Sequence, residues 1–228
     1  MTLLKRLVAA VAFACLFIVQ PVYAQTILRD AETDALFADM TRPIIEAAGM
    51  SPKNVKVVIL QDPEINAFVA GGQTVYINSG LIEAATDANQ VQGVFAHELG
   101  HIVGGHAPLS SRMGKSATGI TIASLLLGAI AAAAGSGDAA MGAILAGQRA
   151  AMGSVLAYSR TQEASADAAG ASFLTKAHVS GKGMLDFFKT LQNQEYRLAI
   201  PQTDSFNRSH PLTGDRIAAL SQTLQSAP

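Results

Sequence analysis

The chain has 228 residues, of which 50% are hydrophobic and 14% are charged, and its formal net charge at pH 7 is −1. This composition excludes an intrinsically disordered chain, and the balanced charge gives no indication of nucleic-acid binding. Because Cys15 is the only cysteine, the rest of the chain folds without disulfides and takes its stability from packing or from a metal.

The first 24 residues have the pattern of a secretory signal peptide. Two basic residues precede an apolar run from Leu7 to Val19, and small residues follow at the positions before Ala24 that a signal peptidase reads. A retained membrane anchor is the alternative, but this run is shorter than the roughly 20 residues that a spanning helix needs. We therefore predict cleavage after Ala24, export to the periplasm of a bacterium, and one domain over residues 25–228.

The segment after the signal peptide predicts a helix, a strand and a β-hairpin. Leu36, Met40 and Ile44 recur every four residues, which indicates an amphipathic helix that ends near Gly49, with Pro43 as a position where it can kink. The apolar run VKVVIL, residues 55–60, predicts a buried strand.

The segments EINAFVA and QTVYIN flank Gly71 and Gly72, and two glycines allow the positive φ angles of a tight hairpin turn. A short helix is expected near residues 81–85. Asp87 is then placed to cap the next helix.

This next helix contains the sequence HELGH. His97 and His101 are four residues apart, so both imidazoles leave one helix face, about 5–6 Å apart at Cβ, and can share one zinc ion. Glu98 lies off that face, where it can act as a general base toward the attacking water. Because apolar neighbours bury this helix, unpaired ionisable side chains would be costly there, which favours a metal site over a chance match.

Two segments compete for the third zinc ligand. The pattern HExxHxxGxxH requires a histidine at position 107, and His106 comes one residue early, about 100° away around a helix. We expect His106 instead to close the C-terminus of its helix, where a cation is favoured. Glu163 and Asp167 share one face of a later alanine-rich helix, so Glu163 can ligate zinc while Asp167 accepts the second ring N–H of a zinc histidine. An ordinary solvated acidic face is the alternative.

Between these motifs lies an apolar segment rich in alanine and glycine. No charged residue occurs from Ser116 to Gly137, which is long enough for a membrane span. Residues 135–138 predict a turn, and Gln148 and Arg149 interrupt the second half. These features favour a hairpin of two helices over residues 116–150, buried against the domain or a membrane surface, as a lid, a dimer face or a membrane-docking element.

In five sequence blocks the chain resembles the family of zinc metallopeptidases that includes HtpX, BepA and the CAAX prenyl endopeptidases. The blocks are RDAETDALFADMTRPIIEAAGM, NAFVAGGQTVYINSGLI, HELGHIVGGH, SRTQEASADAAG and RSHPLTGDRI, which cover nearly the whole chain after residue 24. We expect neither the C-terminal repeat domain of the BepA type nor the pair of N-terminal membrane helices of HtpX.

The resemblance implies a role for each polar residue of the metal blocks. His97, His101 and Glu163 would hold one Zn²⁺ per chain, and Glu98 would be the base. Asp167 would accept a hydrogen bond from the second ring N–H of a zinc histidine. His210 matches a family histidine near the metal, where it either stabilises the oxyanion or blocks the metal. Arg216, six residues on, matches a structural arginine.

The resemblance also implies that the strand after the two glycines lies at the rim of the cleft and pairs with an extended substrate. An unpaired strand edge offers backbone groups that hold any peptide, so specificity would be broad. The expected substrate contacts are Asn66, Ala67, Gly72, Gln73, Thr74 and Val75.

These features predict an α+β, mainly helical, zincin-like metallopeptidase domain, with a small β-hairpin sheet beside the HExxH helix and an alanine- and glycine-rich helical hairpin. The expected activity is hydrolysis of peptide bonds, with misfolded or unassembled envelope proteins as substrates by family analogy. A non-catalytic zinc-binding chaperone or assembly factor is the alternative, although a purely structural site has no use for Glu98 as a base. A membrane-associated scaffold would leave the metal residues unexplained.

Overall fold

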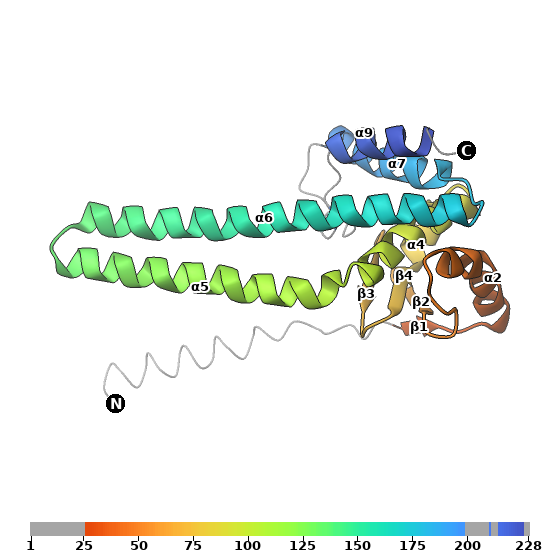
Figure 1. Cartoon of the computed structure of the whole chain (residues 1–228), viewed down its shortest axis with the longest axis horizontal. Helices are drawn as coiled ribbons and strands as arrows, with labels where there is room; N and C mark the ends of the chain where they lie inside the picture. The colour runs from red at the N-terminus through yellow and green to blue at the C-terminus, as the bar shows by residue number, and fades with distance from the viewer. Residues whose placement is uncertain (1–25, 199–209, 211–213, 226–228) are drawn as a thin grey trace, which may run out of the picture.

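The computed structural model describes residues 26–198, 210 and 214–225, so the predicted signal peptide lies outside the described residues. The fold is mainly helical with one small sheet, as the sequence predicts (Figure 1). The elements in chain order are β1 (Thr26–Leu28), α2 (Ala31–Ala47), β2 (Lys56–Gln61), β3 (Ala67–Ala70), β4 (Thr74–Asn78), α3 (Ser79–Ala84), α4 (Ala88–Val103), α5 (His106–Ala133), α6 (Gly137–Lys176), α7 (Lys182–Leu198) and α9 (Gly214–Gln225).

The four strands form one mixed sheet in the order β1-β2-β4-β3. β3 and β4 form the predicted antiparallel hairpin, and its turn contains Gly71 and Gly72 at φ angles of 62° and 96°, which glycine adopts without strain. β2 pairs in parallel with the other side of β4. The expectation that the strand after the glycines is an unpaired edge is therefore wrong, and β3 lies at the end of the sheet instead.

Helix α2 begins at the cap residue Asp30, whose carboxylate accepts a hydrogen bond from the Thr33 backbone N–H at 2.9 Å. The predicted helix is confirmed, but one part of its apolar stripe is not. Leu36 is 57% exposed, whereas the adjacent Phe37 is buried. The buried side is formed by Phe37, Thr41, Ile44 and Ile45, so Ile44 is buried as predicted and Leu36 is not. On this helix the packing partners are α6, α4 and β2.

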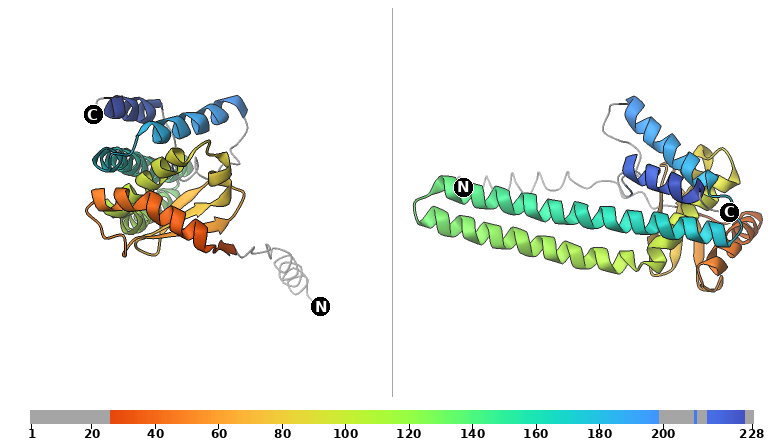
Figure 2. Two further views of the ribbon diagram at one scale, coloured as in Figure 1. Left: turned by 90° about the vertical axis from the view of Figure 1, so that its right-hand side faces the viewer. Right: turned by 45° about the horizontal axis from the view of Figure 1, so that its top comes forward.

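Helix α4 lies at the centre of the domain, in contact with α6, α7 and the sheet. Its N-terminus is capped by Asp87, as predicted, through a hydrogen bond of 3.0 Å from the Gln90 backbone N–H. Val94, Phe95 and Leu99 have no exposed surface. α7 and α9 lie together on the other side of α6 from the sheet (Figures 1 and 2). Polar side chains on α4 are thus enclosed by packed helices.

Helices α5 and α6 form an antiparallel hairpin that projects far beyond the domain (Figures 1 and 2). The helices approach closely where a Cβ on Gly147 would meet the Ser124 side chain and one on Gly128 would meet Ile144. The predicted hairpin is present. Of the two surfaces predicted to bury it, the domain and a membrane, the domain does not cover it, because the large apolar side chains of the hairpin are exposed. It is one continuous pair of helices, of which α6 runs for 40 residues from the predicted turn back into the domain.

Candidate metal centre

The site is built where α4 crosses α6 with almost no side chain between the two backbones. A Cβ on Gly100 would lie 2.6 Å from the Ala166 carbonyl oxygen, and one on Gly170 would lie 3.0 Å from the Ala96 carbonyl oxygen. These two glycines let the HExxH face of α4 meet the acidic face of α6. The sequence predicted an alanine-rich helix here, but neither glycine was predicted to matter. Gly100 directly precedes His101, and Gly170 follows Asp167 by three residues, which is the signal that could have found them.

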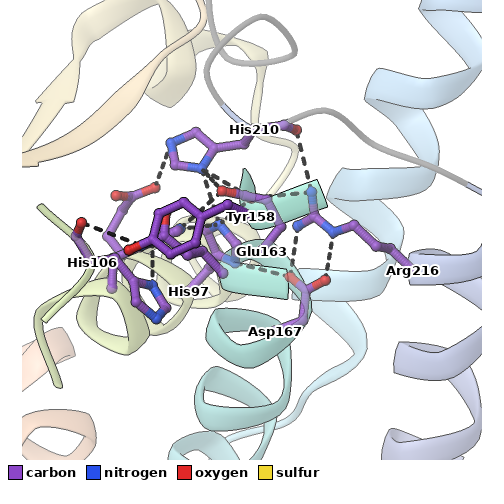
Figure 3. A network of polar contacts seen from close by, with 10 residues as sticks. His97, His106, Tyr158, Glu163, Asp167, His210 and Arg216 are labelled. Carbon is purple, nitrogen blue, oxygen red and sulfur yellow. Dashed lines mark hydrogen bonds and ion pairs between the residues drawn. The ribbon is translucent and has the colours of Figure 1, made fainter. Parts of the chain in front are cut away.

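At this crossing the side chains of His97, His101 and Glu163 come together with His210, which precedes α9 (Figure 3). The Nε2 atoms of His97 and His101 lie 3.1 Å apart. Glu163 Oε2 lies 3.3 Å from His97 Nε2, and Glu163 Oε1 lies 3.4 Å from His101 Nε2. Nδ1 of His210 lies 3.3 Å from His97 Nε2 and 3.2 Å from Glu163. Four donor atoms thus face one point.

The spacing of these donors fits a tetrahedral metal ion. Zinc bonds to nitrogen and oxygen of about 2.0–2.2 Å place the ligands of a tetrahedron about 3.3–3.6 Å apart. Five of the six pairs among these four residues have donor contacts of 3.1–3.4 Å, and the sixth, His101 with His210, lies within the 4.8 Å that encloses all four ligand atoms. Imidazole and carboxylate are also the donors that zinc accepts. His97, His101, Glu163 and His210 could therefore hold the metal that the sequence predicts.

A second row of polar side chains holds the donors in place. Asp167 Oδ1 lies 2.9 Å from Nδ1 of His97, which directs the Nε2 of that ring toward the other donors. Arg216 donates two hydrogen bonds to the Asp167 carboxylate, at 2.7 and 2.8 Å, and its Nη1 lies 3.1 Å from Glu163 Oε2. Nη1 also donates to the His210 carbonyl oxygen at 3.4 Å. Arg216 thus links α9, α6 and the segment that carries His210.

Glu98 stands apart from this hydrogen-bonded row. Its side chain is buried, and neither carboxylate oxygen accepts a hydrogen bond from the described part of the chain. Nε2 of His210 lies 3.4 Å from Oε1 of Glu98. Burial raises the pKa of Glu98, although the charges of His210 and His97 oppose that shift. A carboxylate in this environment is a stronger base than an exposed one.

The electrostatic field of the cluster favours a cation among its donors. Burial acts to lower the pKa of His97, but the carboxylates of Asp167 and Glu163 raise it to about 10. Burial and the neighbouring His97 charge lower the pKa of His101 to about 2. Burial opposes ionisation of Glu163, yet hydrogen bonds from His210 and His97 hold its pKa well below the ordinary value. The carboxylates of Asp167 and Glu163 favour the protonated form of His97, and the same negative charge would favour a divalent ion among the donors.

The prediction that His106 closes the C-terminus of the HExxH helix is wrong. His106 is also not among the converging donors. The backbone breaks at Gly105, which has a φ of 63°, and His106 begins α5. Its Nδ1 lies 2.8 Å from Nδ1 of His101, the ring nitrogen that points away from the metal donors. With Nε2 of His101 facing the metal position, its Nδ1 carries the hydrogen and donates to His106. His106 is thus a positioning residue that sequence analysis missed.

We expect His106→Ala to weaken zinc affinity by about 10–100-fold, as the loss of an outer hydrogen-bond partner does. His106→Asn is the matched control, because its amide oxygen can accept the same N–H. Competition with a chromophoric zinc chelator measures both variants without reference to activity. A zinc affinity of His106→Ala equal to that of the unaltered chain would exclude this role.

The substrate contacts expected from the hairpin differ in how far they are exposed. Val75 has no exposed surface and lies in the core, so the expectation that it contacts substrate is wrong. Gly72 and Gln73 are exposed in the turn, and Asn66 and Thr74 are half-buried. Ala67 likewise has no exposed surface, so the expectation that it contacts substrate is also wrong.

Comparison with known proteins gives one family match. The model of "Peptidase family M48" matches residues 29–224. Metalloprotease YcaL of Escherichia coli K12 is 30% identical over 172 residues, which are 73% of this chain and 60% of YcaL. The beta-barrel assembly-enhancing protease of the same organism is 28% identical over 160 residues, 70% of this chain and 32% of that protein.

A third relative is the mitochondrial metalloendopeptidase OMA1 of Bos taurus, 27% identical over 180 residues, 78% of this chain and 34% of OMA1. The chain therefore spans between about a third and three fifths of the length of these three relatives.

Proposed function

The chain belongs to peptidase family M48. We propose that it is a metalloendopeptidase, that its metal is zinc and that its substrates are unfolded proteins of the cell envelope. The observation that carries the proposal is the set of donors at tetrahedral spacing beside the buried carboxylate of Glu98. One relative is a beta-barrel assembly-enhancing protease, and its name supports the envelope, and hence the periplasm, as the place of action.

A zinc ion held by His97, His101 and Glu163 would supply a Lewis acid that polarises the scissile carbonyl and lowers the pKa of the attacking water. Glu98 takes the proton of that water and passes it to the leaving amine, for which its raised pKa suits it. Asp167 fixes the ring of His97, and Arg216 fixes Asp167 and Glu163. The side chains that react are thus held by side chains that do not.

His210 lies among the converging donors, in the position of a fourth metal ligand. A catalytic zinc site keeps one position open for water and substrate. With His210 placed as in Figure 3, a zinc ion held at this point would have four protein donors. We therefore propose that His210 leaves this position when substrate binds, and that its N–H then stabilises the oxyanion.

The substitution His210→Ala should lower kcat by about 10²–10³-fold, the cost of one oxyanion donor. Removing the ring opens the metal position but also removes that donor, and we expect the second effect to dominate. The three other donors should retain the metal, so zinc content is the control. Faster cleavage of casein, or self-cleavage, would show that blockage is the main role of His210.

Strand β3 is the candidate docking edge for an extended substrate. The Asn78 backbone N–H donates to the Asn66 carbonyl oxygen at 3.0 Å, which fixes the alternation of the antiparallel ladder. Residues 66, 68 and 70 then bond to β4, and the backbone groups of residues 67 and 69 point away from it. Ala67 has no exposed surface, so the half-buried Val69 is the residue that offers its backbone at this edge. β3 also contacts α4, the helix that carries the metal histidines. A peptide added to this edge would bind through its backbone, which only an unfolded segment can offer.

We expect Val69→Pro to lower kcat/KM for casein at least several-fold, because proline removes an N–H on the open side of β3 and spares the ladder to β4. Val69→Ala shortens the same side chain but keeps that N–H, so it should cleave close to the normal rate. Equal losses in both variants would assign the effect to the side chain and contradict the strand-addition model.

The substrate class is tested with one β-barrel outer-membrane protein in two states. We expect cleavage of the urea-unfolded barrel after dilution and no cleavage of the same barrel folded in detergent. Cleavage of both at similar rates would contradict the proposed preference for unfolded chains.

A further inference from the structure

Most of the large hydrophobic side chains that are exposed in the described structure lie on the α5–α6 hairpin, far from the metal centre. Outside the hairpin they are Ile27, Leu28, Leu36 and Val103. Those on the hairpin are Ile122, Leu125, Leu126, Leu127, Ile130, Met141, Leu145, Met152, Val155 and Leu156. An apolar surface of this extent is normally covered by another molecule.

The directions of these side chains identify what covers them. Leu125, Leu126 and Leu127 follow one another at about 100° around α5, so they face more than half of its circumference. Their exposed fractions are 49%, 62% and 60%. A second protein would cover one face of the hairpin, whereas lipid surrounds it. A helix that is apolar all round belongs in a protein core or in a membrane, and only 11% of residues 115–133 is buried here.

The charges along the hairpin match the thickness of a membrane. Lys115 and Arg160 are exposed at the base of the hairpin, on α5 and α6, and Asp138 is exposed at its tip. Along α6, Asp138 and Arg160 are separated by about 33 Å at 1.5 Å per residue, and α5 extends about 27 Å beyond Lys115. The hydrocarbon of a bilayer is about 30 Å thick. The segment Lys115–Ala133 also has the length and mean hydropathy, 1.8, of a membrane span.

We propose that residues 116–159 cross the hydrocarbon of a lipid bilayer as a helical hairpin, with Lys115 and Arg160 at the headgroups beside the catalytic domain. The turn decides between complete crossing and insertion halfway. The first N–H groups of α6 have no partner within the helix, and such groups are not exposed to hydrocarbon. Complete crossing places them, with Asp138, at the opposite headgroups.

This topology goes beyond the proposed function and does not depend on it. Arg149 is the only charged residue between Asp138 and Arg160, and it opposes insertion without outweighing ten large apolar side chains. Glu163 follows Arg160 by three residues, which is less than one helical turn. The metal centre would therefore face polypeptide segments at the membrane surface.

Cysteine labelling tests the topology, because Cys15 is the only native cysteine and can be replaced by serine. The complete chain carries one new cysteine, as Leu127→Cys in mid-helix, Ser136→Cys in the turn or Lys182→Cys in the domain. Each variant is reconstituted into phosphatidylcholine and phosphatidylglycerol vesicles. A membrane-impermeant maleimide is added before and after detergent.

We expect Leu127→Cys to react only after detergent is added, and the externally labelled fractions of Ser136→Cys and Lys182→Cys to add up to about one. Rapid external labelling of Leu127→Cys would overturn the proposal. A Ser136→Cys variant that reacts from neither side would also overturn it, because this result indicates insertion halfway. Protection of Leu127→Cys in the absence of vesicles would overturn it as well, because this result indicates a protein partner.

A matched pair of glutamates separates insertion from a general effect of charge. Leu126 and Leu36 are 62% and 57% exposed, on the hairpin and on α2. Leu126→Glu should at least halve the fraction of Ser136→Cys that lies across the membrane from the domain, whereas Leu36→Glu should leave it unchanged. The same result for both variants would contradict the crossing hairpin.

Discussion

The substitution Glu98→Gln should lower the rate of casein cleavage by about 10²–10⁴-fold, the contribution of a positioned general base, and leave the bound metal in place. Glutamine keeps the shape of the buried side chain but cannot take a proton from water. Glu98 is not among the converging donors, so the metal content should stay at about one zinc per chain.

Glu83→Gln is the control for this substitution, because Glu83 is an exposed glutamate on α3 and should cleave casein at the normal rate. Persistent cleavage by Glu98→Gln would remove Glu98 as the base. Loss of the metal in the same variant would place Glu98 among the ligands instead.

The second large effect is expected for Glu163→Ala, which should strip the metal and abolish cleavage. Its carboxylate faces both zinc histidines, at 3.3 and 3.4 Å, and no other acidic side chain is among the converging donors of the described chain. Asp167→Ala should weaken zinc affinity or activity by only about 10–100-fold, because Asp167 acts through the ring of His97.

Asp167→Asn accompanies this pair, because alanine would leave the buried guanidinium of Arg216 without its two-bond partner and could unfold the domain. Zinc content and chelator competition are measured on all three variants after circular dichroism has established folding. If Glu163→Ala and Asp167→Ala both bind zinc as the unaltered chain does, α6 does not supply the third ligand.

Local patterns in the sequence predicted much of this fold. The glycine pair between two β-rich segments predicted the β3–β4 hairpin, and Asp87 predicted the start of α4, because turns and caps depend on neighbouring residues. The parallel pairing of β2 with β4 could not be predicted in this way. β3 and its two flanking loops separate β2 from β4 in the sequence, so no local pattern indicates that these two strands pair. The pairing nevertheless decides that β3, and not β4, lies at the edge of the sheet.

The candidate site, like the fold, could be predicted from the sequence only in part. The spacing of His97, His101 and Glu98 indicated a metal site directly, whereas His210 and Arg216 were found only through the resemblance to a family. No local pattern links Arg216 to Asp167, which lies 49 residues earlier. His106 was misplaced because a continuous helix was assumed through Gly105, where the chain instead turns into α5.

The central claim, a zinc centre that hydrolyses peptide bonds, is tested most directly by metal content and casein cleavage on one preparation. We expect about one zinc per chain, loss of cleavage when a chelator removes it, and recovery when zinc is returned. Full cleavage by the metal-free chain would contradict it.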